Sequence, residues 1–198
     1  MTILYEIANS LYVNITNHCP CDCTFCLRNE GESVGGSGSL WLEREPELSE
    51  IIEEFKKWDL SKYSEVVFCG YGEPLERIYE VVEVCKYIRS ISKIKIRLNT
   101  NGLANLIHGK NTEIMLEGLM DSVSISLNAP SKEEYLALCK PKFGIKSFDS
   151  LLLFAEEVKQ YVKEVQFSVV DDITSEQIQR CKELSMAMNI PLRVRCKQ

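Results

Sequence analysis

Residues 11 to 26 read LYVNITNHCPCDCTFC, which predicts a strand followed by a cysteine-rich loop. The β-branched and aromatic side chains of residues 11–16 favour a strand over a helix. Four cysteines then follow within eight residues, at positions 19, 21, 23 and 26. Because thiolates select zinc, copper(I) and iron–sulfur clusters, this density indicates a shared inorganic centre.

Five more strand-like segments follow, with helical segments between them. The expected strands are 11–16, 65–68, 94–98, 122–127, 164–170 and 192–196. The expected helices are 46–58, 75–90, 111–119, 131–138, 147–162 and 174–188. Repeated β-α-β units imply a parallel sheet with right-handed crossovers. Six strands are too few for a closed eight-stranded barrel, so we expect an α/β fold with a partial (β/α)6 TIM-like barrel and an open parallel sheet. A doubly wound flat sheet is the alternative.

Length and charge restrict the class of protein further. The chain has 198 residues, which favours a single domain over residues 1–198. Its 29 acidic and 23 basic residues give a net charge of −6, which argues against a broad surface for nucleic-acid phosphates. No apolar run approaches the ~18 residues of a membrane span, and the N-terminus does not resemble a signal peptide. We therefore expect a cytoplasmic protein that does not contact membranes.

Three of the loop cysteines, Cys19, Cys23 and Cys26, have the spacing C-x3-C-x2-C. Structural zinc sites use four ligands, usually in two separated pairs, and no second close pair is present. Cys21 could be a fourth ligand, but crowding makes a tetrahedral site awkward, and we interpret it as a bystander. An iron–sulfur cluster on three thiolates would leave one iron open. A non-catalytic zinc or iron–sulfur binding module, or a scaffold, remains the alternative.

The pattern C-x3-C-x-Φ-C, with Phe25 as its aromatic residue, resembles the signature of the radical S-adenosylmethionine (SAM) enzymes. The resemblance implies a [4Fe–4S] cluster on Cys19, Cys23 and Cys26, with SAM chelating the fourth iron. It also implies the activity: the reduced cluster cleaves SAM to methionine and a 5′-deoxyadenosyl radical, which abstracts hydrogen from an unidentified substrate. The whole chain would then form a minimal radical SAM core.

The second expected strand runs into a glycine-rich turn. Its residues Tyr71, Gly72, Glu73 and Pro74 resemble the Gly-Gly-Glu-Pro motif of the same superfamily, and Tyr71 departs from the first glycine. The resemblance implies that backbone carbonyls of this turn and the carboxylate of Glu73 accept hydrogen bonds from the ammonium group of SAM. Without the cysteine loop, the segment would read as an ordinary turn before a helix.

Polar residues at the ends of the later strands extend the resemblance. It implies that Asn99 contacts SAM and that Ser126 and Asn128 contact the ribose, with polar residues facing solvent on an edge strand as the alternative. The family's Gly-x-Ile-x-Gly-x-x-Glu motif is absent from the fifth strand, where the backbone of Val169 is a candidate for packing on the adenine. Arg195 is a candidate for the SAM carboxylate, with an ordinary surface arginine as the alternative. Parallel α/β sheets place their chemistry at the carboxyl ends of the strands, where all these residues lie.

Within the superfamily, the stretch FCGYGEPL at residues 68–75 most resembles the TatD-associated radical SAM proteins. Glycyl-radical activating enzymes and 7-carboxy-7-deazaguanine synthases are the nearest other subclasses. The resemblance implies a substrate that is a protein or a nucleotide-derived molecule. It also implies an electron donor such as a flavodoxin or ferredoxin, and a functional link to a TatD-type nuclease.

Overall fold

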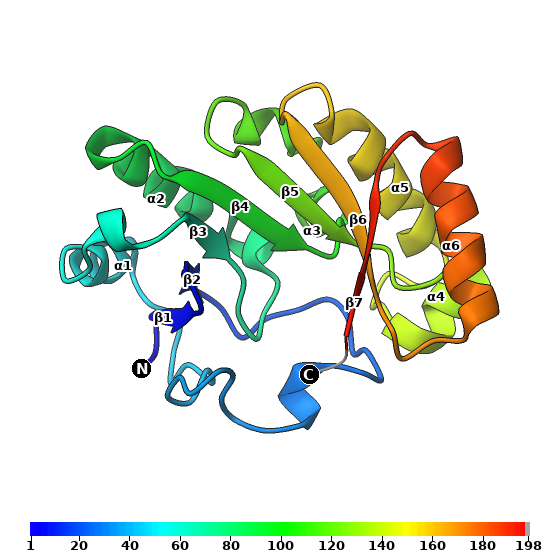
Figure 1. The fold of residues 1–198 in the computed structure, drawn as a ribbon, viewed down its shortest axis with the longest axis horizontal. Coiled ribbons are helices and arrows are strands. Elements are labelled where there is room, and N and C mark those ends of the chain that lie inside the picture. Colours follow the sequence, from blue (N-terminus) through cyan, green and yellow to red (C-terminus); the bar gives the residue numbers. More distant parts are fainter. Residues whose placement is uncertain (197–198) are drawn as a thin grey trace.

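The computed structural model describes residues 1–196, and its centre is one seven-stranded sheet (Figure 1). The strands lie side by side in chain order: β1 (Leu4–Ile7), β2 (Ser10–Val13), β3 (Glu65–Phe68), β4 (Lys95–Thr100), β5 (Ser122–Ser126), β6 (Glu164–Val170) and β7 (Leu192–Arg195). β1 and β2 are antiparallel, and every later pair of neighbours is parallel. This arrangement places the carboxyl ends of β2 to β7 at one edge.

The helices connect the parallel strands. The α-helices are α1 (Leu48–Phe55), α2 (Ile78–Ile91), α3 (Ala104–His108), α4 (Lys132–Cys139), α5 (Lys146–Val158) and α6 (Ser175–Ala187). Four short 3-10 helices are η1 (Leu27–Asn29), η2 (Leu60–Lys62), η3 (Pro74–Arg77) and η4 (Glu113–Leu116). Within residues 1–196, no helix has the length and apolarity needed to cross a membrane.

Two helix starts show how local sequence sets the boundaries. The side chain of Ser131 accepts a hydrogen bond from the backbone N–H of Glu134 at the start of α4. At the start of α6, Thr174 and Gln177 form a reciprocal capping box, in which each side chain bonds the other residue's backbone N–H. Both arrangements satisfy N–H groups that a helix start otherwise leaves unpaired.

Alternation along the strands gives the sheet two different faces. On β4, Ile96 and Leu98 are fully buried in the core that the helices cover, whereas Arg97 and Asn99 are half-buried on the opposite face. Arg195 on β7 interacts electrostatically with Cys69, just after β3, although three strands lie between β3 and β7. We infer that the sheet curves toward this second face. We call this surface the concave face.

The predicted fold class, an open and mostly parallel α/β sheet of the partial-barrel type, is confirmed. All six expected strands are present, and β1 is an additional strand that pairs antiparallel with β2. β1 was missed because its turn depends on Ala8, a residue without a turn signature that adopts a φ of 51°.

The expected helix at 111–119 was wrong, because only the 3-10 helix η4 forms there. The α-helix lies earlier, as α3, and ends at Gly109 in the left-handed conformation. The side chain of Asn105 then accepts hydrogen bonds from the N–H and the hydroxyl of Thr112. These bonds tie the start of the segment to α3 and leave room only for a short turn.

Candidate active site

The cysteine loop follows β2 at the carboxyl edge of the sheet and is held against the end of α4. The backbone N–H groups of Asp22 and Thr24 donate to the carbonyls of Cys139 and Leu138, at 3.0 and 2.9 Å. The N–H of Lys142 donates to the carbonyl of Pro20 at 2.8 Å. A rigid helix end therefore positions the loop that carries the predicted ligands.

The thiols of this loop form one interacting group. Hydrogen bonds with the thiols of Cys139 and Cys21 lower the pKa of Cys23, and a hydrogen bond with Cys21 lowers the pKa of Cys19. Hydrogen bonds with the thiols of Cys19 and Cys23, together with burial, raise the pKa of Cys21. The thiolate is the metal-binding form, so these shifts favour ligation at Cys19 and Cys23 over Cys21.

Arg28 adds a positive charge that the sequence interpretation missed. Its Nε donates to Sγ of Cys26 at 3.2 Å, and its Nη2 donates to the carbonyl of Cys21 at 3.1 Å. Burial alone would lower the pKa of Arg28, but the hydrogen bond to Cys26 and the charges of Cys26, Cys19 and Cys23 raise it. The same guanidinium therefore lies near all three predicted ligands. In the sequence, only the position of Arg28 two residues after Cys26 could have indicated this role.

The donor set fits an iron–sulfur cluster. Across residues 1–196, no three His, Cys, Asp or Glu side chains converge closely enough to hold one metal ion. A four-iron cube binds its three thiolates at three different corners, which requires wider spacing than a single ion does. Thiolate ligands with N–H donors directed at the sulfur are typical of such clusters.

The glycine-rich turn after β3 packs directly on the cysteine loop. The N–H of Gly72 donates to the carbonyl of Thr16 at 3.0 Å, and that of Glu73 donates to the carbonyl of His18 at 2.8 Å. A Cβ on Gly72 would lie 2.4 Å from the Thr16 oxygen, so only glycine allows this approach. Two motifs more than forty residues apart in sequence are therefore adjacent.

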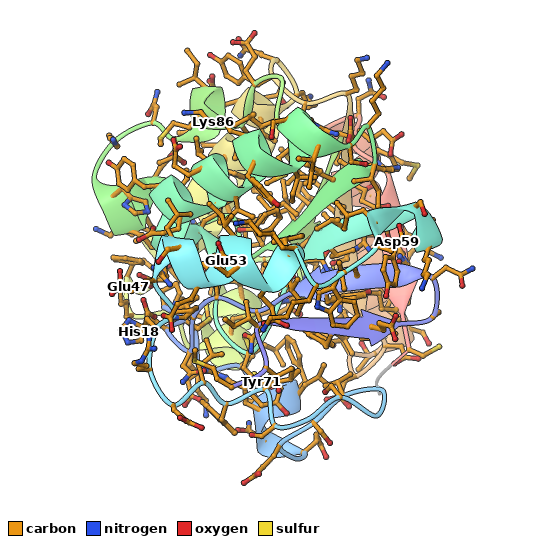
Figure 2. The ribbon with its side chains drawn as sticks, turned by 90° about the vertical axis from the view of Figure 1, so that its left-hand side faces the viewer. His18, Glu47, Glu53, Asp59, Tyr71 and Lys86 are labelled. Atoms are coloured by element: carbon orange, nitrogen blue, oxygen red, sulfur yellow. The ribbon has the colours of Figure 1, made fainter. Side chains whose placement is uncertain are left out.

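The ring of Tyr71 holds a third segment in place. Its hydroxyl donates to the carbonyl of Gly31 at 2.7 Å, and its ring packs edge-on against Trp41. Figure 2 shows Tyr71 between the β1–β2 pair and this segment, with His18 at the molecular surface. At the first-glycine position of the motif, this chain therefore uses the side chain to anchor the loop between residues 31 and 41.

Glu73 is a buried carboxyl that ties the turn to the end of β4. It accepts hydrogen bonds from the N–H of Leu75 at 3.0 Å, the hydroxyl of Thr100 at 2.7 Å and the N–H of Asn101 at 2.7 Å. Burial raises the pKa of Glu73 to about 7, although these hydrogen bonds act in the opposite direction. Of about four lone-pair sites on a carboxylate, one remains available for a ligand ammonium group.

We expect the chain without cofactors to lose stability as pH rises, because of Glu73. The unfolded carboxyl ionises near its ordinary value of 4.5 and the folded one near 7, so stability falls between these values. Between about pH 5.5 and about pH 8.5 the loss is about 2 kcal/mol. Urea denaturation should show this loss in the wild type and not in Glu73→Gln. The control Glu133→Gln removes an exposed carboxyl, and its unfolding free energy should change with pH as in the wild type. The same pH dependence in all three proteins would contradict the assignment of this loss to Glu73.

Two asparagines at the end of β4 have different positions. Oδ1 of Asn99 accepts a hydrogen bond from Nη1 of Arg97 at 2.7 Å, so this side chain extends toward the concave face. Nδ2 of Asn101 lies 3.9 Å from Sγ of Cys19, and its Oδ1 accepts from the N–H of Leu103 at 2.9 Å. Asn101, which was not among the predicted contacts, is therefore the residue nearer to the cysteine loop.

Two predicted SAM contacts carry a buried polar atom with no partner among residues 1–196: Oδ1 of Asn128 and Nε of Arg195. Oδ1 of Asn14, just after β2, is a third such atom at this edge. Asn128 has a φ of 59°, and its Nδ2 donates to Sγ of Cys139 at 3.7 Å. Buried polar atoms normally find partners, so an unpaired acceptor and an unpaired donor are suited to a polar ligand. Both residues were predicted SAM contacts, and this observation fits a ligand such as SAM.

The remaining predicted contacts have the following positions. Ser126 is half-buried at the end of β5, in register with Ser168 on β6. The side chain of Val169 is fully buried in the core, which leaves only its backbone for the proposed adenine contact. Phe25 is partly buried and packs against the core, and Pro74 is buried at the first position of η3.

Comparison with known proteins places the chain in a large family. The sequence profile of the Radical SAM superfamily matches residues 13–184. A probable dual-specificity RNA methyltransferase RlmN of Caldanaerobacter subterraneus is 28% identical over 140 residues, which is 67% of this chain and 37% of that protein. One from Protochlamydia amoebophila is 30% identical over 138 residues, covering 66% and 36%. The chain thus spans a little over a third of the length of these relatives.

Solved structures share the fold at low sequence identity. Streptococcus suis SuiB bound to the precursor peptide SuiA has a TM-score of 0.67 and 15% identity, covering 98% of this chain and 40% of that one. A radical SAM methyltransferase from Sphaerobacter thermophilus has a TM-score of 0.61 and 15% identity, covering 98% and 68%. These similarities confirm the architecture.

Proposed function

The chain belongs to the radical SAM superfamily, and from that premise we propose that it cleaves SAM reductively to start hydrogen abstraction from a substrate. The cofactors of this family are a [4Fe–4S] cluster and SAM. Held at this site, they would supply one-electron chemistry, the reductive cleavage of SAM to methionine and a 5′-deoxyadenosyl radical. The observation that carries the proposal is the single interacting group formed by Cys19, Cys23, Cys26 and Arg28 at the carboxyl edge of the sheet.

The residues of the cysteine loop hold the cluster in this proposal. Cys19, Cys23 and Cys26 are the three protein ligands. Cys21 donates its proton toward two of them and stays unligated, and the guanidinium of Arg28 offsets the negative charge of the thiolates. Because each thiolate has a donor nearby, the loop can carry several negative charges in a half-buried position.

The turn and the strand ends hold SAM. The turn of Tyr71, Gly72, Glu73 and Pro74 takes the ammonium group through its carbonyls and the free lone pair of Glu73. Asn128 accepts from a ribose hydroxyl through its unpaired Oδ1, with Ser126 beside it on β5, and Arg195 donates to the carboxylate through its unpaired Nε. Asn99 and the backbone of Val169 complete the site, and Phe25 shields it.

The subclass, domain organisation and partners are part of the same proposal. We assign the chain as a single domain of the TatD-associated group, rather than to the glycyl-radical activating enzymes or the 7-carboxy-7-deazaguanine synthases. Its electron donor would be a flavodoxin or ferredoxin, and a TatD-type nuclease would be a functional partner. The relatives named RlmN favour a second candidate, methyl transfer to RNA. The net charge of −6 disfavours that candidate for this chain alone.

Anaerobic reconstitution tests the proposed activity. We expect about four irons and four sulfides per chain, and release of 5′-deoxyadenosine on addition of SAM and dithionite. SAM should also change the EPR signal of the reduced cluster. A chain that binds one zinc ion, or that binds a cluster and never releases 5′-deoxyadenosine, would contradict the proposal. Methylated RNA as a product would favour the second candidate.

A further inference from the structure

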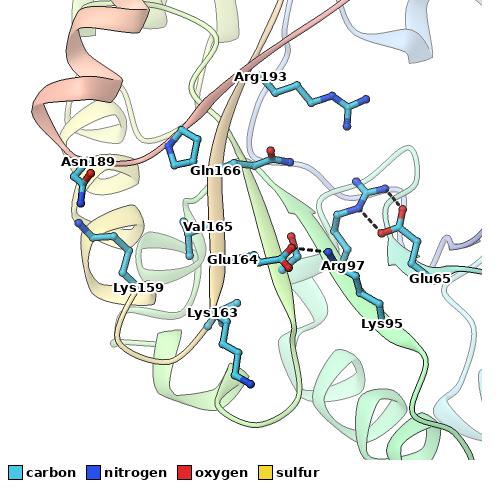
Figure 3. Close-up of a pocket in the computed structure, with 13 residues that line it drawn as sticks. Glu65, Lys95, Arg97, Lys159, Lys163, Glu164, Val165, Gln166, Asn189 and Arg193 are labelled. Atoms are coloured by element: carbon cyan, nitrogen blue, oxygen red, sulfur yellow. Dashed lines mark hydrogen bonds and ion pairs between the residues drawn. The ribbon is translucent and has the colours of Figure 1, made fainter.

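The concave face of the sheet contains a pocket of about 710 Å³ (Figure 3). Glu65, Lys95, Ser122 and Glu164, the first residues of β3, β4, β5 and β6, line its floor, and Arg193 of β7 lies on its wall. The volume lies within the ordinary range of small-molecule sites, roughly 300–1,000 Å³. No role has been assigned to this pocket so far.

The pocket is positively charged although the chain is acidic. Five cationic side chains and two carboxylates line it, in a chain of net charge −6. Three of the cations are neutralised by carboxylates: Arg97 pairs with Glu65 through two hydrogen bonds of 3.0 and 2.7 Å, Lys95 pairs with Glu164, and Lys159 pairs with Glu156. A local excess of positive charge on an acidic protein attracts anions selectively.

Two of the five cations have no ion pair among residues 1–196: Lys163, just before β6, and Arg193, on β7 and nearer the carboxyl edge of the sheet. The guanidinium of Arg193 makes no ion pair or hydrogen bond with the residues that the structure describes, and neither does the side-chain amide of Gln166. Figure 3 shows both side chains extending into the same space, above the Glu65–Arg97 pair. Together they present several N–H donors toward an empty part of the pocket.

The pocket floor is formed by the first residues of the strands, but Arg193 on its wall lies level with a proposed SAM contact. Arg193 is in register with Ser168, which is in register with Ser126 at the carboxyl end of β5. Arg97 of the pocket wall also donates to Asn99, a proposed SAM contact. A molecule held by Arg193 would therefore lie on the same face of the sheet as the proposed SAM contacts and level with Ser126.

We propose that Arg193 and Gln166 bind an oxyanion, a phosphate or carboxylate group, of a small-molecule substrate in this pocket. The planar guanidinium fork matches both groups, and the amide adds a neutral donor. This inference rests on the proposed function, since it takes the pocket as the substrate side of the radical SAM site. It specifies the substrate class: a small anion anchored at Arg193, with its reacting carbon toward the carboxyl edge.

Titration calorimetry on the full chain tests the site without SAM turnover. The probes are inorganic phosphate and succinate, each at constant ionic strength. We expect one of them to bind the wild type and to bind Arg193→Gln about tenfold or more weakly. Gln166→Leu should also weaken binding, because a directed contact needs the amide. Tighter binding of phosphate identifies a phosphorylated substrate, and tighter binding of succinate identifies a carboxylic acid.

The control is Lys182→Gln, which removes an exposed positive charge from α6, outside the pocket, and should bind like the wild type. The inference is overturned if the wild type binds neither anion, or if Arg193→Gln and Lys182→Gln have equal effects. Release of 5′-deoxyadenosine is measured separately on the reconstituted enzyme. Anion binding at Arg193 without that release contradicts the proposed function alone, and release without anion binding contradicts this inference alone.

Discussion

The Cys23→Ala variant is expected to lose the iron–sulfur cluster and the release of 5′-deoxyadenosine together. Cys23 is a half-buried thiol whose pKa is lowered by hydrogen bonds with the thiols of Cys139 and Cys21. Alanine removes one of only three protein ligands, and no fourth loop cysteine is prepared as a thiolate. We expect iron and sulfide contents after anaerobic reconstitution to fall from about four per chain to near zero.

The matched control is Cys21→Ala, two residues earlier in the same loop. Cys21 is more buried than the predicted ligands, lies 3.9 Å from the hydroxyl of Tyr135 and is held in its protonated form. We expect this variant to keep both the cluster and the turnover. If Cys21→Ala and Cys23→Ala lose iron to the same extent, the assignment of three ligands is wrong.

The order of strands and helices along the chain could be predicted, because each strand has its own pattern of β-branched and apolar residues. β-branched runs such as residues 122–127 alternate with amphipathic helices, and right-handed crossovers then leave few arrangements open. What escaped prediction depended on single backbone conformations. The β1–β2 hairpin depends on the positive φ of Ala8, and α3 depends on the left-handed Gly109. Neither conformation has a periodic pattern that a sequence window could detect.

The candidate site divides in a similar way. Cys19 and Glu73 stand in short motifs with fixed spacing, which a sequence displays directly. The contribution of Arg28 and of Asn101 depends on the direction of a side chain and on the meeting of two loops in space. The charge of the concave pocket was equally hidden, because its five cations come from three separate parts of the chain (β4, the segment between α5 and β6, and β7) and the chain as a whole is acidic.

Replacement of Gly72 by alanine is the second change for which we expect a large effect. The added Cβ would lie 2.4 Å from the carbonyl oxygen of Thr16 and 2.6 Å from that of His18. Both oxygens accept hydrogen bonds from the turn itself, so neither can move away without losing a bond. We expect the free energy of unfolding to fall by about 3 kcal/mol. A misplacement of about 1 Å at such a site lowers turnover on the order of a hundredfold.

Because of the position of this turn, loss of SAM affinity can be measured separately from loss of the iron–sulfur cluster. The atoms nearest to a Cβ on Gly72 belong to Thr16 and His18, just before the cysteines, so Gly72→Ala should retain much of its iron while losing affinity for SAM. Anaerobic calorimetry with SAM, alongside iron analysis, measures both quantities. Gly31→Ala is the control, because a Cβ there meets no atom within 4 Å. Since the Tyr71 hydroxyl bonds the carbonyl of Gly31, this control alters the same loop system without crowding it. Unchanged SAM affinity in Gly72→Ala would mean that the turn only supports the cysteine loop and does not bind SAM.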